Sequence, residues 1–518
     1  MYRAYTVNCY DIKSFFPREL THGLLTPLQK PGKQKGPPAN LRPIIILSIL
    51  RKLLTICLLR RAWDRIKEKI PVNQAAYQPG RSTTEQVFAI KILCEKAIAS
   101  NNYQVHLLLL DMSKAFDMVL RDKLLESLEK ILYPDEIHLL SILTNRPTLQ
   151  VKLENNLGRE FSTYLGIMQG DSLSAILFIF YLAECLNEKN DFTQELKNEP
   201  TENDNTFNVD PFYADDTTFA STQEDGLRRL ERIQNNIPQQ LKKYNLQTNA
   251  TKTEKYSIPR PEPEEVIPTY EDLEKHKEDK CLWSEFDYLV NYHPKQENNN
   301  PNWKKCKLLG SNLDSEEDIK RRKIMSMGTM EKLSISFKSS KISLQCKIKL
   351  FTSYVHPIML YNCELWTISS KIEKSIDSYQ RRLLRKLLKI KWPKNISNDK
   401  LYQITKTEKW SITIKRRRLK WLGHLLRLPE QTPAQRSLQE ALKETPKKVG
   451  RPITNWLQNI KTDILTLNIA EINKEDSIQI IIEKIKKYAL DREAYKKIVD
   501  CCIPKVKVSG SLQPETVF

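Results

Sequence analysis

Three aspartates define the chemistry that this sequence could perform. Asp215 and Asp216 are adjacent in the segment FYADD, and Asp111 ends the apolar run Leu107 to Leu110. Such a run is typical of a strand buried on both faces, and this strand would deliver Asp111 to its rim. Carboxylates this close repel one another without cations. Two divalent ions about 3.5 to 4 Å apart stabilise the attacking and leaving oxygens of phosphoryl transfer. We therefore predict a site for two Mg²⁺ ions, with Mn²⁺ as a possible substitute.

The adjacent aspartates also have an ordinary interpretation. Asp is a common hairpin-turn residue, and a four-residue motif arises easily by chance. The surrounding sequence favours the metal site, because an apolar strand rarely ends in a charge without a use for it. Asp117, six residues after Asp111, adds a further acid to the same segment. Together these acids indicate a polymerase.

The order of further motifs resembles that of the reverse transcriptases of non-LTR (LINE-type) retrotransposons. The matching segments are 30–33 with 40–44, 74–83 (QAAYQPGRST), 111–119 (DMSKAFDMV), 166–174 (GIMQGDSLS), 212–216, 249–254 (NATKTE) and 308–311 (LLGS). Segments 354–366, 379–388, 416–424 and 450–456 are similar to the carboxyl-terminal region of the same elements. The sequence departs from the family pattern at Ala76-Tyr77, Met168 and Ala175. None of these departures removes a group that the reaction needs.

The resemblance implies an α+β right-hand polymerase with fingers, palm and thumb, followed by a basic, mainly helical carboxyl-terminal region. We expect fingers and palm at 1–258, an acidic insertion rich in Asn and Pro at 259–302, a primer-grip element and thumb-like helices at 303–390, and the basic region at 391–518. Helices are predicted at 46–69, 83–99, 121–131, 171–188 and 223–244, with strands before Asp111 and around 212–216. The polymerase motifs begin within about the first thirty residues, so we expect no amino-terminal endonuclease domain in this chain.

The resemblance also implies roles for individual residues. The metal ligands would be Asp111, Asp215, Asp216 and the backbone carbonyl of Met112, and Lys252 would protonate the leaving pyrophosphate as a general acid. The nucleotide-binding residues would be Lys30, Arg42, Phe116, Gln169 and Gly170. Lys30 and Arg42 would hold the triphosphate, Phe116 would exclude a ribose 2′-hydroxyl, and Gly170 would permit close backbone approach.

Each of these residues has a simpler interpretation. The lysines and Arg42 could be solvated surface charges, Phe116 a core aromatic, and Gln169-Gly170 part of a helix cap. The functional interpretation depends on their occurring together in the order of the family.

The basic charge is concentrated in the carboxyl-terminal part. Residues 1–300 hold 38 Lys and Arg against 41 Asp and Glu, a net charge of −3, and residues 301–518 hold 45 against 22, a net charge of +23. Two clusters at helical spacing are predicted to bind nucleic acid: Arg381, Arg382, Arg385, Lys386, and Lys415, Arg416, Arg417, Arg418, Lys420. Trp392, Trp410 and Trp421 lie among them, and the sequence shows no compensating acids nearby. The alternative is a solvated helix face.

Several classes of protein are disfavoured. The ten cysteines form no C-x-x-C pair, which argues against a disulfide framework or zinc finger and suits a reducing compartment. Asp11 and Lys13 interrupt any signal peptide. The longest apolar stretch, 173–186, contains Glu184 and is too short to span a membrane. The expected location is nuclear or cytoplasmic.

The sequence thus predicts an RNA-directed DNA polymerase that uses an RNA template, a DNA primer or target and deoxynucleoside triphosphates, without a membrane partner. Two alternatives stay open. One is a catalytically inactive or domesticated remnant that only binds nucleic acid. The other is an RNA-templated RNA polymerase.

Overall fold

The predicted helices of the amino-terminal half are present. The computed structural model describes residues 17–30, 32, 34–145, 147–187, 206–259, 303–390, 396–446 and 453–503. The predicted helices are α3 (Ile49–Lys67), α4 (Thr83–Ala99), α5 (Arg121–Glu129), α7 (Ser174–Asn187) and α9 (Gln223–Lys243). Helix α3 begins three residues later than predicted, because Ser48 caps it by accepting a hydrogen bond from the Arg51 amide. Residues 260–302 of the expected insertion at 259–302, and Trp392, lie outside the described residues.

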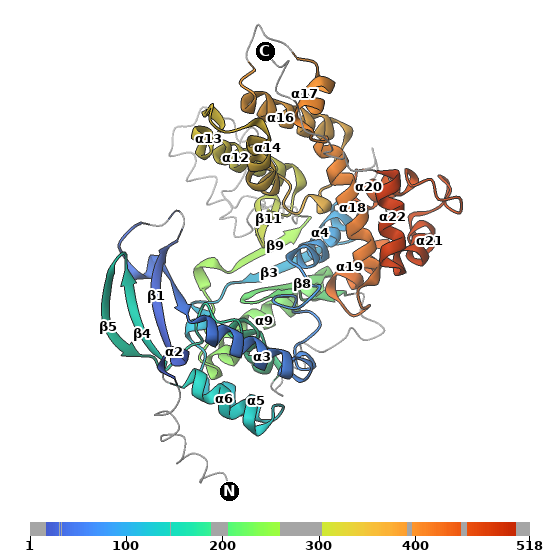
Figure 1. Cartoon of the computed structure of the whole chain (residues 1–518). Coiled ribbons are helices and arrows are strands. Elements are labelled where there is room, and N and C mark those ends of the chain that lie inside the picture. Colours follow the sequence, from blue (N-terminus) through green and yellow to red (C-terminus); the bar gives the residue numbers. More distant parts are fainter. Residues whose placement is uncertain are drawn as a thin grey trace, which may run out of the picture.

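A four-stranded sheet forms the part of the molecule expected to be the fingers. Its strands are β1 (His22–Gln29), β2 (Leu41–Leu47), β4 (Thr148–Leu153) and β5 (Asn156–Ser162), in the order β2-β1-β4-β5. Strands β1 and β4 are parallel, and the other neighbours are antiparallel. The short helix α2 (Arg18–Thr21), α3 and α6 (Pro134–Thr144) lie next to this sheet (Figure 1).

The central sheet carries the candidate site. Strand β3 (Val105–Leu110) lies between β8 (Asp216–Thr222) and β9 (Glu254–Ile258), while β6 (Asn208–Val209) and β7 (Phe212–Tyr213) pair with β8. Alternate residues of β3 enter two different cores. Val105 and Leu107 pack with α4, and Leu108 and Leu110 pack with α7 and α9. The prediction of a strand buried on both faces is confirmed.

A small hairpin leads from the central sheet into a helical unit. Strands β10 (Lys307–Leu308) and β11 (Ser311–Asn312) form the hairpin at the predicted primer-grip element. The helices that follow are α12 (Ser315–Lys332), α13 (Ser334–Lys338), α14 (Leu344–Leu350), the π-helical turn η5 (Phe351–Val355), α15 (His356–Met359), α16 (Ser370–Leu387) and α17 (Asn398–Thr405). They enclose a core of their own, to which Trp410 and Ile414 also belong.

The last helices pack with α4 on one face of the central sheet. They are α18 (Trp410–Arg427), α19 (Pro433–Leu442), α20 (Trp456–Leu465), α21 (Ile478–Leu490) and α22 (Arg492–Cys502). Figure 1 shows them beside α4, with which they share one hydrophobic core. The Phe88 ring of α4 lies edge-on to Trp456, with centroids 4.9 Å apart. The Lys96 ammonium, also on α4, contacts Glu440 Oε1 at 3.0 Å. The carboxyl-terminal helices therefore complete the core that supports β3.

Prediction from the fold: Trp456→Ala should lower the free energy of unfolding by about 3 to 5 kcal/mol. The reason is that Trp456 is 1% exposed and fills the junction between α20 and α4. Chemical denaturation followed by far-UV circular dichroism measures this loss. Tyr164→Ala is the matched control, because Tyr164 is 66% exposed and should change stability by no more than about 0.5 kcal/mol. Equal effects of the two substitutions would contradict the shared core.

Candidate active site

The backbone brings the three aspartates to one end of the central sheet. In the antiparallel ladder between β3 and β8, Leu110 pairs with Thr217. Asp111 follows Leu110 and Asp216 precedes Thr217, so the two acids are opposite each other one step beyond this pair. Asp215 occupies the tight turn between β7 and β8, and Ala214 has a φ of +55° in that turn. The strands predicted around 212–216 are confirmed.

The pKa values of Asp215 and Asp216 show that burial and convergence disfavour the charged forms of these carboxylates. Burial raises the pKa of Asp216 to about 6, with further contributions from the negative charges of Asp215 and Asp111. The pKa of Asp215 is also raised, mainly by burial and then by the charge of Asp111. The Lys252 ammonium lies 2.8 Å from Asp111 Oδ2 and opposes both shifts. Lys252 comes from the 3₁₀ turn η3 (Ala250–Lys252), as the motif order predicted.

The chemistry of these donors fits hard divalent cations. Carboxylate oxygens are the ligands that Mg²⁺ prefers, and a cation would favour the charged forms that burial and mutual repulsion disfavour. Among the residues that the structure describes, no three Asp, Glu, His or Cys side chains are arranged to enclose a metal ion. The Lys252 ammonium is the positive charge that contacts Asp111 in this arrangement.

A second polar group lies beside the first. Asp117, in the 3₁₀ turn η2 (Ala115–Asp117), accepts a hydrogen bond from Gln169 Nε2 at 3.0 Å. Burial raises the pKa of Asp117, while Gln169 and the positive charges of Lys114 and Lys30 lower it. Lys30 therefore lies near Asp117, at the end of β1. The structure brings Lys30 and Gln169 of the predicted nucleotide-binding residues to the same acid.

Gly170 lies at the contact between the four-stranded sheet and the segment of Gln169. The Gln169 carbonyl accepts a hydrogen bond from the Ile45 amide at 2.8 Å. Gly170 has a φ of +135°, and a Cβ built on it would lie 2.2 Å from the Ile45 carbonyl oxygen. A side chain cannot fit there, so glycine is needed for the close contact of the two backbones. This supports a positioning role for Gly170.

The other predicted site residues have different surroundings. The Phe116 ring stacks on Phe178 of α7, with centroids 4.3 Å apart, and is only partly buried. Met112 is buried and forms a β-bridge with Thr248. Arg42 is exposed on β2, opposite Leu28. The structure does not bring Arg42 into any hydrogen bond or ion pair with the aspartates described above.

Gln74 is a positioning residue to which the sequence analysis assigned no role. Its Oε1 accepts hydrogen bonds from the amides of Ala214, at 2.9 Å, and Ala76, at 3.0 Å. Gln74 is 2% exposed, and it also forms a β-bridge with Phe212. The turn that carries Asp215 is thus fixed by a buried side chain 140 residues earlier in the chain. Gln74 is the first residue of the family-like segment 74–83, and this segment is the sequence signal for it.

Asn249 and Tyr77 also approach the aspartates. Asn249 Nδ2 lies 3.3 Å from Asp111 Oδ2, and the backbone N–H of Asn249 donates to the backbone carbonyl of Asp111 at 2.8 Å. Tyr77 has a φ of +58° and is 47% exposed. Burial raises the pKa of Tyr77, followed by the charge of Asp215. Tyr77 is thus an aromatic ring close to Asp215, at a position where the sequence departs from the family pattern.

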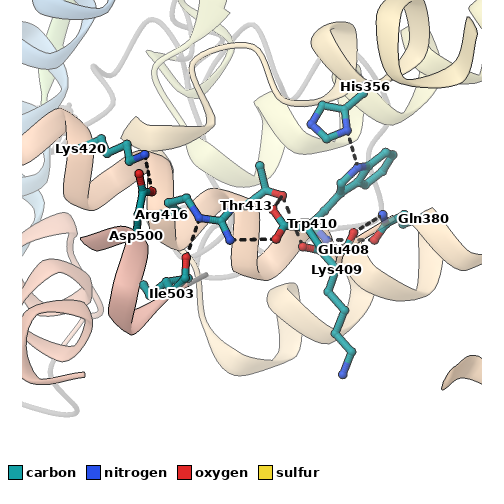
Figure 2. Close-up of polar contacts among 10 residues, drawn as sticks. All are labelled: His356, Gln380, Glu408, Lys409, Trp410, Thr413, Arg416, Lys420, Asp500 and Ile503. Carbon is teal, nitrogen blue, oxygen red and sulfur yellow. Dashed lines mark hydrogen bonds and ion pairs between the residues drawn. The ribbon is translucent and has the colours of Figure 1, made fainter. Parts of the chain in front are cut away.

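Two of the five cations of the second basic cluster are buried and four lie beside acids, so the expectation of no nearby acids is wrong. Arg416 is 4% exposed and forms a two-pronged ion pair with Glu408, while Arg418 is 5% exposed and contacts Asp463 at 2.9 Å. Lys420 contacts Asp500 at 2.6 Å, and Lys415 lies 4.0 Å from Asp463. Asp463 and Asp500 lie on α20 and α22, far along the chain, whereas Glu408 precedes α18 and is only eight residues from Arg416. Figure 2 shows the contacts of Arg416 with Glu408 and of Lys420 with Asp500.

The tryptophans of this region are also internal. Trp410 is fully buried and Trp421 is 7% exposed, so neither ring is available to stack on bases. The first cluster differs, because Arg382 and Lys386 of α16 are exposed and Arg381 and Arg385 are partly exposed. The residue Arg417 on α18 is exposed overall, and its Nη1 donates to the Leu360 carbonyl.

Comparison with known proteins identifies the class. A family profile described as "Reverse transcriptase (RNA-dependent DNA polymerase)" matches residues 28–313, which is more than half of the chain. The chain therefore belongs to the reverse transcriptase family, and the resemblance seen in the sequence is confirmed. Its fold is that of an α+β right-hand polymerase, whose members generally use divalent metal ions.

Two relatives from Drosophila melanogaster carry the comparison further. One is named "Probable RNA-directed DNA polymerase from transposon BS" and is 29% identical over 188 residues, which are 36% of this chain and 20% of the relative. The other, from transposon X-element, is 25% identical over 183 residues, which are 35% of this chain and 20% of the relative. The aligned part thus spans about one fifth of each relative.

Solved structures of telomerase also show similarity. The protein from Candida Tropicalis with a fragment of telomeric RNA is 14% identical, with a TM-score of 0.36, and the match covers 94% of this chain and 68% of that chain. The protein from Candida albicans is 12% identical, with a TM-score of 0.38, and the match covers 76% of this chain and 66% of that chain.

No helix in the described ranges is long and apolar enough to cross a membrane.

Prediction from the site: without divalent metal, Asp216→Asn should raise the melting temperature at pH 7.5 by on the order of 1 to 2 °C. The folded protein holds the pKa of Asp216 near 6, above its ordinary value of 3.8, so ionisation at neutral pH opposes folding. The gain should shrink as the pH falls below 6 and vanish below about pH 3, where the carboxyl is protonated in both states.

Thermal denaturation in EDTA at several pH values provides the measurement. The control is Asp225→Asn on α9, whose side chain is 65% exposed. A gain from Asp216→Asn that does not depend on pH would contradict the raised pKa of Asp216.

Proposed function

We propose that this protein is an RNA-directed DNA polymerase that copies retroelement RNA into DNA by two-metal-ion nucleotidyl transfer. The observation that carries the proposal is the convergence of Asp111, Asp215 and Asp216 at one end of the central sheet, with Lys252 in contact with Asp111. Membership of the reverse transcriptase family supports this chemistry. The proposed cofactor is Mg²⁺, with Mn²⁺ as a substitute.

In the proposed site, each residue has a task that follows from its chemistry. Asp111 and Asp215 would hold the cations, with help from Asp216 and the Met112 carbonyl. When bound, the two ions supply the positive charge that stabilises the attacking and leaving oxygens. Lys252 holds a proton at Nζ, next to Asp111, where it can act as a general acid. Gln74 keeps the Asp215 turn in place.

The nucleotide would bind between the fingers sheet and the aspartates. Lys30, at the end of β1, and Arg42, on β2, supply cations for the triphosphate. Gln169 and Gly170 join β2 to the Asp117 segment. Phe116 would select against a ribose 2′-hydroxyl, and its partly buried ring stacked on Phe178 is consistent with a rigid steric wall.

The proposed partners are an RNA template, a DNA primer or target and deoxynucleoside triphosphates. The exposed cations of α16, Arg382 and Lys386, with the partly exposed Arg381 and Arg385, would contact phosphates. In the second cluster, we propose that Arg417 and the partly exposed Lys415 and Lys420 contact phosphates. Arg416 and Arg418 are excluded because they are buried in ion pairs. Such an enzyme would act in the nucleus or cytoplasm.

Prediction for the function: Asp111→Asn and Asp215→Asn should each lower nucleotide incorporation by more than about 100-fold, since even indirect partners of metal ligands contribute 10 to 100-fold. The assay is primer extension on an RNA template with Mg²⁺ or Mn²⁺. Binding of the template and primer should change little. Asp225→Asn, at an exposed position of α9, is the charge-matched control. Full incorporation by either site variant would contradict the assignment, and absence of extension by the wild type would favour a remnant that only binds nucleic acid.

A further inference from the structure

A short segment of the carboxyl-terminal region contacts the predicted primer-grip hairpin. Tyr361 and Asn362 lie between α15 and α16, outside the residues 28–313 that match the family profile. The Tyr361 hydroxyl donates to the Leu309 carbonyl at 3.0 Å, and Asn362 Nδ2 donates to Ser311 Oγ at 3.0 Å. The two side chains therefore hold the tip of the hairpin and the start of β11.

The tip of the hairpin depends on contacts that stabilise it. Leu309 and Gly310 have φ values of +45° and +81°, and a residue other than glycine seldom adopts a positive φ. Arg321 Nη1, on α12, donates to the Gly310 carbonyl at 2.9 Å. The Cζ atom of the buried Arg322 lies 4.6 Å from the centroid of the Tyr361 ring, a cation–π contact that favours this ring orientation. Tyr361 is thereby fixed between the hairpin and α12.

The same two side chains contact the first turn of α4. Thr84 Oγ1 donates to Asn362 Oδ1 at 3.0 Å, and Thr83 Oγ1 lies 3.3 Å from the Tyr361 hydroxyl. Asn362 is 6% exposed, and a buried amide needs partners for both its oxygen and its nitrogen. The nitrogen of Asn362 bonds to the hairpin and the oxygen bonds to α4. Tyr361 and Asn362 thus join the hairpin to α4.

The start of α4 leads back to the turn that carries Asp215. The first residue of α4 ends the family-like segment 74–83, and Gln74, at the other end of that segment, accepts a hydrogen bond from the turn. Burial raises the pKa of Tyr213 on β7, and the charge of Tyr361 raises it further, so the two phenol rings lie near each other. The hairpin, Tyr361 and the Asp215 turn therefore belong to one connected network.

We propose that Tyr361 and Asn362 are positioning residues for nucleotide addition, because they fix the β10–β11 hairpin relative to the turn that carries Asp215. A primer end held by the hairpin would then meet the aspartates in a constant geometry. A displacement of about 1 Å at the reacting atoms can lower a rate by roughly 100-fold. This inference rests on the proposed function, and it assigns a role in that reaction to residues beyond those that match the family profile.

The test is single-turnover primer extension on an RNA template with Mg²⁺, with enzyme in excess and over a range of deoxynucleotide concentrations. Tyr361→Phe removes the hydroxyl and keeps the ring, while Thr84→Val removes the donor to Asn362 with little change in shape. Each should lower the maximal rate of addition by about 3- to 10-fold, as expected for the loss of one hydrogen bond. The amplitude, which measures the fraction of active complex, should change little. The deoxynucleotide concentration at half-maximal rate should also change little, because the predicted nucleotide-binding residues lie on other elements.

Two control variants distinguish positioning from ordinary packing. Thr84→Ser keeps the hydroxyl and should retain the wild-type rate. Tyr495→Phe removes a buried hydroxyl of α22 that donates to the Leu419 carbonyl of α18 at 3.1 Å. It is matched to Tyr361→Phe in chemistry but has no contact with the hairpin in the network described above, so it should leave the rate unchanged.

Several outcomes would overturn the inference. One is a wild-type rate in both Tyr361→Phe and Thr84→Val. Another is a reduced amplitude with an unchanged rate, which is the result expected of a purely structural role. A third is an equal loss of rate in Tyr495→Phe. If the wild type does not extend a primer, the proposed function fails and this inference fails with it. If the wild type extends the primer and the two variants match it, only this inference fails.

Discussion

The repulsion among three aspartates is the constraint on which this structure depends. Asp111 and Asp216 face each other across a strand pair, and Asp215 lies in the adjoining turn. The pKa values of Asp215 and Asp216 are raised first by burial and then by the neighbouring negative charges. The backbone must hold these charges together, and two features do so. Strand β3 is buried on both faces, and Gln74 bonds to the turn from within the core.

The carboxyl-terminal helices contribute to this support through α4. They form one core with α4, β3 and β9, and Lys96 of α4 is tied to Glu440 of α19. Part of the strong positive charge of this region is consumed internally, since Arg416 and Arg418 are buried with Glu408 and Asp463. Removing one partner of such a pair leaves an uncompensated buried charge, which typically costs about 3 to 5 kcal/mol. The basic residues of this region therefore stabilise the fold, in addition to any contact that they make with phosphates.

The sequence predicted the elements whose signals are local. The apolar run before Asp111 and the helices at 83–99 and 223–244 are present because periodicity and burial act over short stretches. The convergence of Asp111, Asp215 and Lys252 followed from the order of motifs. It also agrees with the ladder of β3 and β8 and with the ion pair of Asp111.

What the sequence could not predict depends on partners far along the chain. Arg418 finds Asp463 after 45 residues, and Lys420 finds Asp500 after 80. A local count of charges cannot reveal these two pairs, although Glu408 lies only eight residues before its partner Arg416. The role of Gln74 was missed for the same reason, because Ala214 lies 140 residues away. Tryptophans at helical spacing were equally ambiguous, and Trp410 and Trp421 belong to cores.

The most direct test of the account is a count of bound divalent ions. Electron paramagnetic resonance with Mn²⁺ would measure them in a complex of protein, RNA template, dideoxy-terminated DNA primer and matching deoxynucleotide. The account predicts two tightly bound Mn²⁺ ions in the wild type and clear loss of binding in Asp111→Asn and Asp215→Asn, because an amide is a poor ligand for a hard cation. Unchanged Mn²⁺ binding in both variants would contradict the claim that these carboxylates converge to hold metal.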